Sequence, residues 1–377
     1  MKTSKPTNDS ARSLGILACT ACTACIAGVL GLGAVGCGWS SGDEVDSVSL
    51  RAETQLPARA GSVIIDGCVI DTWQRATLAG PGARRVLQEV IMLCLVPRLD
   101  GTVGPRDPSA VQAIAAAVAD LKKEGYRVHL GVSFTDESGQ RYDGAQTRAF
   151  LADSAWRAKF RETLVPALAP ADGVELDLQG LPSEARQSIT ALVTEIAQAV
   201  KPGKRLGIFV PPSVENPSDL PGGEAFARAD LAKQVDRMRI MTLDFSDQGP
   251  GPTIDPGWAV DAIRLARRDS AAVDVSYPLY GTDFGPRGRR STTYLESIAT
   301  ASLARASIER GPTTAPFVRY IAFDNAPHEM WFDDAQSTAH ALGAWTHAVL
   351  PADVGVVFYG LGAEEPGLFE RLGARMP

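Results

Sequence analysis

Short apolar runs alternate with longer amphipathic stretches along the chain after residue 60. Eight of the runs have the length and composition of buried strands, and several intervening stretches carry apolar residues at helical spacing. This alternation predicts right-handed βα units with a parallel sheet buried on both faces. The predicted strands are Ser62–Ile65, Val90–Val96, Arg127–Val132, Gly173–Leu178, Arg205–Val210, Arg237–Leu243, Val273–Tyr277 and Val354–Tyr359.

The number of strands favours a closed (β/α)8 barrel of the α/β class over a doubly wound open sheet, which has the same local pattern. The interval between the seventh and eighth strands is long and contains a strand-like run at Phe317–Phe323. We therefore expect a small insertion there. The clearest helices are predicted at Ser109–Lys123, Arg148–Leu168, Ser183–Val200 and Trp258–Arg267.

The N-terminus has the pattern of an export signal, with a basic stretch through Arg12 and then an apolar run from Leu14 to Val35. The run ends in Ala34-Val35-Gly36-Cys37, which resembles a bacterial lipobox. Residues 1–36 are therefore predicted to be a lipoprotein-type signal peptide, with Cys37 as the lipidated residue. A plain signal peptide or an uncleaved anchor is the alternative interpretation.

The segment after the export signal is polar, acidic and without periodicity, so residues 37–60 are predicted to be a flexible linker. Residues 61–377 then form the barrel. This arrangement predicts an exported protein held at the cell membrane or the outer membrane by its lipid anchor.

Charge and motif content exclude several classes of function. The formal net charge is −7, and the first 36 residues carry +2, so the remainder carries −9. That balance argues against a nucleic-acid partner and against binding anionic lipid through charge. The mature chain has no HExxH spacing, nucleophile elbow or phosphate loop, so neither a metal nor a nucleotide cofactor is implied. Cys68 and Cys94 either form one disulfide or remain two buried thiols.

The fourth predicted strand carries the most informative polar pattern. Glu175, Asp177 and Gln179 alternate with apolar residues along it, so all three share the face that points into the barrel. Burying acidic groups there is costly unless they pair or share a proton, and a purely stabilising interior would use Val or Ile. A structural polar network is the alternative interpretation of this face.

Residues 172–179 resemble the Asp-Gly-x-Asp-x-Asp-x-Glu run of glycoside hydrolase family 18, except for Glu175 at the second Asp and Gln179 at the Glu. Several further segments resemble that family in the same order, and one of them, Gly251 to Trp258, resembles a motif of its spore-cortex-lytic branch. These segments are Met241-Thr242-Leu243-Asp244, Gly251 to Trp258, Pro278-Leu279-Tyr280-Gly281, His328 to Ala335 and Gly355 to Gly362.

The resemblance implies a substrate-assisted glycosidase, an exception to the usual pair of catalytic carboxylates. By position, Asp177 assists the substrate acetamide, Asp244 is its companion, and the acid and the supporting tyrosine have become Gln179 and Leu243. A glutamine amide has no acidic proton to give a leaving group, and general acid catalysis typically supplies about 10²–10⁴-fold in rate. Glu184 is a weak substitute for the missing acid. Its ordinary interpretation is a carboxylate in the first turn of a helix, where the helix dipole favours negative charge.

The sequence therefore predicts a cell-envelope protein that binds N-acetylhexosamine-containing glycan, such as peptidoglycan or chitin-like chains, with impaired hydrolysis. Glu175, Tyr280, Phe284 and Tyr359 are the expected substrate-binding residues, and packing is the alternative for the three aromatic rings. An active glycosidase that uses another acid is one alternative function. A scaffold that binds a protein partner is the other.

Overall fold

The structure is a computed structural model, and it describes residues 61–136, 138–212, 223–270, 272–323, 325–348 and 354–375. The predicted signal peptide, linker and lipidation site at Cys37 lie outside the described residues. Within those ranges, no helix combines the length and apolar character that crossing a bilayer requires.

Eight parallel strands close into a barrel, which confirms the predicted fold. The barrel closes because the first strand pairs with both the second and the last. A short antiparallel strand, β3 (Val103–Pro105), extends β2 beyond the barrel. The barrel strands are β1 (Gly61–Ile65), β2 (Leu87–Pro97), β4 (Arg127–Ser133), β5 (Gly173–Asp177), β6 (Arg205–Val210), β7 (Arg237–Ile240), β8 (Val273–Pro278) and β14 (Gly355–Tyr359).

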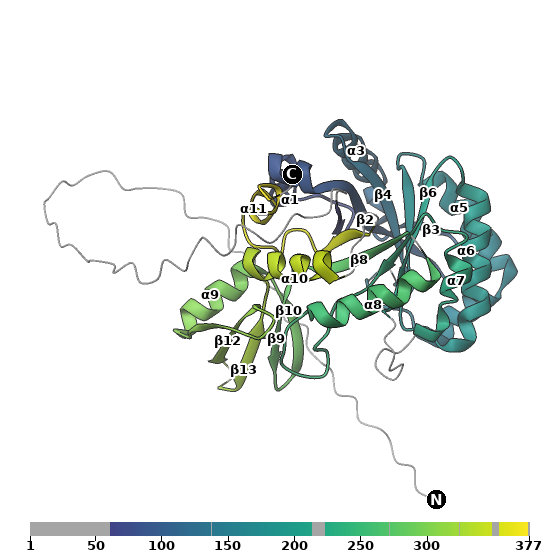
Figure 1. The fold of residues 1–377 in the computed structure, drawn as a ribbon. Coiled ribbons are helices and arrows are strands. Elements are labelled where there is room, and N and C mark those ends of the chain that lie inside the picture. The colour runs from purple at the N-terminus through teal and green to yellow at the C-terminus, as the bar shows by residue number, and fades with distance from the viewer. Residues whose placement is uncertain are drawn as a thin grey trace, which may run out of the picture. The chain divides into compact units, whose positions relative to one another are not determined.

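Helices surround the barrel on its outside (Figure 1). They bury the outward-facing apolar side chains of the strands. The predicted helix at 148–168 is two helices, because Asp153 ends the first and caps the second by accepting hydrogen bonds from the amides of Ala155 and Trp156. The helices are α1 (Thr72–Ala79), α2 (Pro81–Val86), α3 (Val111–Lys123), α4 (Gly144–Ala152), α5 (Ser154–Ala167), α6 (Arg186–Val200), α7 (Arg228–Leu231), α8 (Pro256–Asp269), α10 (Ala335–Ala348) and α11 (Leu368–Gly373).

The insertion between β8 and β14 is larger than the small element predicted, and it forms a second sheet of five antiparallel strands. Figure 1 shows this sheet and its helix beside the barrel, in green and yellow-green. One face of the sheet packs under the helix through Val318 and Met330, and the other carries Phe317 and Trp331. The elements are β9 (Gly281–Gly285), β10 (Gly288–Thr292), α9 (Tyr294–Ala304), β11 (Ile308–Arg310), β12 (Pro316–Ile321) and β13 (Pro327–Trp331).

Candidate active site

The polar face predicted for the fourth strand points into the barrel. Val174 and Leu176 on β5, and Leu178 just after it, are fully buried in the core between the barrel and its helices, so the intervening residues face the interior. The three interior positions nevertheless differ in environment. Glu175 lies deep in the barrel, whereas Asp177 and Gln179 lie toward its C-terminal end, where barrel enzymes carry their active sites.

Glu175 belongs to a buried ionic network that spans the lower part of the barrel. The guanidinium of Arg239 on β7 donates to Glu175 through Nε at 3.0 Å and Nη2 at 2.8 Å, to Asp274 on β8 at 2.7 Å, and also to Glu89 on β2. All four side chains are at most 6% exposed. Ser62 on β1 accepts from Arg239 and donates to Glu89, each at 3.2 Å.

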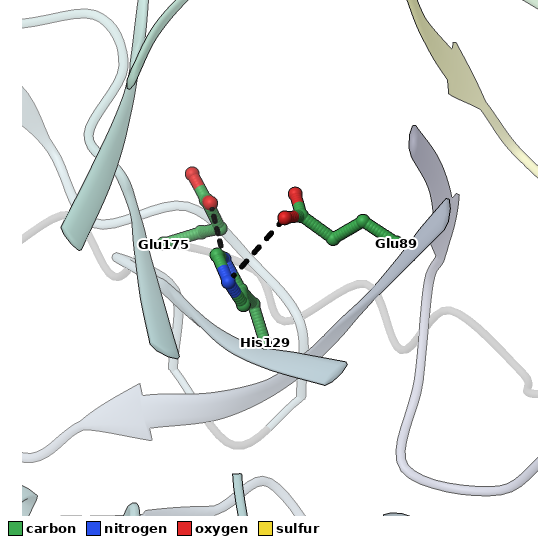
Figure 2. A group of neighbouring side chains, drawn as sticks. All are labelled: Glu89, His129 and Glu175. Carbon is green, nitrogen blue, oxygen red and sulfur yellow. Dashed lines mark hydrogen bonds and ion pairs between the residues drawn. The ribbon is translucent and has the colours of Figure 1, made fainter. Parts of the chain in front are cut away.

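His129 on β4 lies between two carboxylates of this network, as Figure 2 shows. Its Nδ1 is 2.8 Å from Glu175 Oε1 and its Nε2 is 3.4 Å from Glu89 Oε2. These three residues are a possible set of metal ligands. However, the guanidinium of Arg239 already supplies a cation to both glutamates, so the cluster is explained as an ionic network.

Glycines on neighbouring strands leave the space that the network occupies. A methyl group at Gly207 on β6 would lie on the carboxylate of Glu175, and one at Gly355 on β14 would lie on that of Asp274. We therefore place Glu175 in a structural role in the barrel interior, as the alternative interpretation of this strand allowed, and no longer among the candidate sugar contacts.

Asp177 and Gln179 lie together above the network. Gln179 Nε2 donates to Asp177 Oδ1 at 2.7 Å, and the hydroxyl of Ser133 on β4 donates to Asp177 Oδ2 at 3.3 Å. Burial raises the pKa of Asp177, although the hydrogen bond from Gln179 and the charge of Arg141 act in the opposite direction. Asp177 is partly buried, because it pairs with Phe209 of β6 at the level of an apolar cluster inside the barrel.

Asp244 and two tyrosines form the other side of the site. The hydroxyl of Tyr280, after β8, donates to Asp244 Oδ1 at 2.7 Å, and the rings of Tyr280 and Tyr359 meet edge to face at 6.1 Å. Asp244 has a φ of 55°, a strained conformation that is uncommon outside glycine and occurs preferentially at functional sites.

Tyr359 connects the two halves of the site. Burial raises its pKa, and the negative charges of Asp177, Asp66 and Asp244 raise it further. The site therefore gathers side chains from the C-terminal ends of several strands, as the sequence predicts. The residues brought together are Asp177, Gln179, Asp244, Tyr280 and Tyr359.

Phe284 lies apart from this group. Its ring is 9% exposed and packs with Ala315, Phe317 and Trp331 inside the insertion. This location favours the packing interpretation of Phe284.

Glu184, the weak substitute for the missing acid, is exposed at the start of a 3-10 turn, and its carboxylate accepts a hydrogen bond from Ser183 at 3.4 Å.

Asp66, Ser133 and Arg141 also belong to the site, although the sequence did not single them out. Asp66 directly follows β1 and Ser133 ends β4, so both stand at the end of the barrel where function gathers. That position was the available signal for these two. Arg141 lies in a loop that pairs back on Thr135, and no pattern in the sequence marks it.

Cys68 and Cys94 are free thiols in the structure. The Sγ of Cys68 donates to the carbonyl oxygen of Cys94 at 3.1 Å. Of the two arrangements that the sequence allowed, the structure has two unpaired thiols and not a disulfide. Cys94 is buried and Cys68 is partly buried.

Solved structures with the same architecture include two classes of enzyme. The Bacillus cereus spore cortex-lytic enzyme SleL matches with a TM-score of 0.70 and 17% identity, over 85% of this chain and 75% of that one. A chitinase from Chromobacterium violaceum matches with a TM-score of 0.68 and 19% identity, over 84% and 99% of the two chains. The chain has the fold of cortex-lytic enzymes and chitinases. This likeness confirms the resemblance predicted from the sequence, at the level of the fold.

Two further comparisons bear on the site. A Glu-to-Gln variant of a class V chitinase from Nicotiana tobaccum, solved in complex with NAG4, matches with a TM-score of 0.64 and 13% identity, over 82% and 98% of the two chains. By sequence, 114 residues are 32% identical to a cortical fragment-lytic enzyme from Bacillus subtilis. That match spans only 27% of this chain and 26% of the relative, and no protein-family model matches the chain.

Proposed function

We propose that this protein binds N-acetylhexosamine-containing glycan at the C-terminal end of the barrel and does not hydrolyse it efficiently. The observation that carries the proposal is the pairing of Asp177 with Gln179 at 2.7 Å. In this proposal Asp177 holds a sugar acetamide, and the neighbouring amide of Gln179 has no acidic proton to give a leaving group. Efficient catalysis by the implied mechanism requires both groups.

The rest of the site supports binding in the same way. Tyr280 and Tyr359 offer partly apolar rings beside Asp177 and Asp244, and sugars bind to such mixtures of rings and charged acceptors. Leu243 stands where the resemblance implies a supporting tyrosine, and it has no hydroxyl. The tobacco chitinase variant is a precedent of the same fold in which a protein with Gln in place of Glu is bound to NAG4.

The proposal includes the place where the protein works. The export signal and Cys37 are the basis for an exported lipoprotein held at a membrane of the cell envelope. A barrel tethered in this way would meet peptidoglycan or chitin-like chains outside the cytoplasm.

The test is a calorimetric titration of the purified full chain with chito-oligosaccharides and with muropeptide fragments, followed by mass analysis of the same mixtures. Binding that leaves the ligand intact is the expected result. The variant Asp177→Asn should weaken it, because a hydrogen bond to a charged group is worth about 1.5–3 kcal/mol. Shorter sugars in the mixtures, lost in Asp177→Asn, would instead show an active glycosidase. Folded protein with no binding would favour the protein scaffold.

A further inference from the structure

A groove of about 1000 Å³ runs over the insertion, beside the candidate active site. Its walls come from the loop after β7, from β9 and β10, from the end of α9, and from β12 and β13. A volume of this size lies at the upper end of the range for ligand pockets, roughly 300–1,000 Å³. None of the residues gathered in the candidate active site lines it, so the groove is a separate surface.

Arg289 joins the groove to the candidate active site. This arginine lines the groove from β10, and its Nη2 lies 3.5 Å from Asp244 Oδ2. Asp244 in turn accepts a hydrogen bond from the hydroxyl of Tyr280. A ligand seated on the two tyrosines would therefore have the groove immediately beside it, with a guanidinium at the junction.

The groove has a charge opposite to that of the protein as a whole. The chain carries a net charge of −7, yet this surface is lined by three arginines, Arg289, Arg305 and Arg319, against two acidic residues, Asp247 and Glu329. Arg319 is bound to Glu329 at 2.7 Å, and Arg289 has a longer contact of 3.5 Å to Asp244. Arg305 has no ion-pair partner among the described residues. Arg305 is thus unpaired in the described part of the chain, and the guanidinium of Arg289 has a longer contact that a ligand carboxylate can share.

The rest of the lining suits a short peptide. Ile321 is 64% exposed and lies beside Ala304, Ala306 and Pro327, which together offer contacts for small apolar side chains. Asp247, also exposed, lines the same groove and offers an acceptor for an amino group. A surface with exposed cations, small apolar contacts and an acceptor differs from the plain stacking surface that an uncharged sugar needs.

We propose that the groove binds the peptide attached to a peptidoglycan sugar, so that the ligand is a peptide-bearing glycan and not an uncharged chitin-like chain. This inference rests on the proposed function, because the sugar must lie on Tyr280 and Tyr359 for its peptide to reach the groove. The stem peptide of peptidoglycan is attached to the sugar through a lactyl ether. The peptide carries free carboxylates and the methyl groups of alanine residues. Arg289 and Arg305 bind the carboxylates, and Ile321 contacts a methyl group.

The experiment uses the purified full chain and two ligands that differ only in the peptide, the N-acetylglucosaminyl-N-acetylmuramyl disaccharide and the same disaccharide bearing its tetrapeptide. Calorimetry should show binding of the peptide-bearing form about tenfold or more tighter. The variant Arg305→Glu should remove most of that preference and leave the affinity for the bare disaccharide unchanged. Arg305→Lys, which keeps the charge, should retain a preference.

Arg264→Glu is the matched control, because Arg264 is an exposed arginine of α8 that pairs with Asp261. It should leave both affinities unchanged. Equal affinity of the unaltered protein for the two ligands would overturn the inference and leave the proposed function standing. Loss of both affinities in Arg305→Glu with the fold retained would also overturn it, because the effect would not depend on the peptide. If neither ligand nor chitotetraose binds, the proposed function fails as well.

Discussion

The barrel holds two polar clusters that differ in how their charges are balanced. In the lower cluster, one guanidinium, that of Arg239, meets three carboxylates, and a methyl group at the adjacent glycines would collide with it. In the upper cluster, Asp177 accepts hydrogen bonds from the neutral side chains of Gln179 and Ser133, and burial raises its pKa. The lower arrangement serves the fold, whereas the upper one keeps a costly carboxylate at the open end of the barrel, as functional sites do.

The largest effect should come from the centre of the lower cluster. Arg239→Met leaves Glu89, Glu175 and Asp274 buried without their shared cation, which should cost about 3–5 kcal/mol of unfolding free energy. Denaturant unfolding measures this loss. The control Arg264→Met breaks an exposed pair on α8 and should cost less than about 1 kcal/mol. If the two variants lose similar small amounts, the network does not stabilise the barrel in the way described.

The next effect is the response of Glu89 to acid. Burial raises the pKa of Glu89, but the charges of Arg239 and His129 outweigh burial and hold it at about 2, against an ordinary value of 4.5. Between these values the unfolded chain binds more protons, so this group's stabilisation is present above pH 4.5 and is lost as the pH falls toward 2. A shift of this size corresponds to about 3 kcal/mol.

Unfolding free energies measured from pH 6 down to pH 2.5 test this assignment. Glu89→Gln should flatten the acid limb of the curve, while Glu162→Gln, a change in an exposed residue of α5, should leave it unaltered. Equal slopes in all three proteins would contradict the assignment.

The smallest effect on stability comes from Asp177 in the upper cluster. Its dependence on pH runs in the opposite direction to that of Glu89. Because the pKa of folded Asp177 is raised, the folded state binds more protons, and its contribution to stability declines as the pH rises through that pKa. Asp177→Asn should therefore increase stability at pH 7 slightly, while glycan affinity falls about tenfold. Thermal unfolding and calorimetry on the same preparation measure both. A variant that is less stable and binds normally would make Asp177 a structural residue.

The sequence predicted the barrel because each strand is short, apolar and followed by a helical pattern. It predicted the upper site because Asp177, Gln179 and Asp244 stand at strand ends, where the fold itself determines which way they face. The sequence did not predict the partners of Glu175. Arg239 was visible as a charge within a predicted strand, but its pairing with Glu89 joins residues 150 positions apart, which only the closed barrel brings together.

The insertion was underestimated for a related reason. Its strands β9 and β10 are short, and β10 reads Gly-Arg-Arg-Ser-Thr, with no apolar alternation to mark a strand. They form because β9 pairs with β13, which lies more than 40 residues later in the chain. The groove that depends on this pairing has no signature in the sequence.

The most direct test of the account is whether the upper site lacks only its proton donor and its supporting hydroxyl. Product analysis on chitotetraose and muropeptides would compare the unaltered protein with the double variant Gln179→Glu, Leu243→Tyr. We expect the unaltered protein to leave bound ligand intact and the double variant to release shorter sugars at least about 10²-fold faster. Turnover by the unaltered protein that disappears in Asp177→Asn would contradict it, because the site would then have a proton donor other than residue 179.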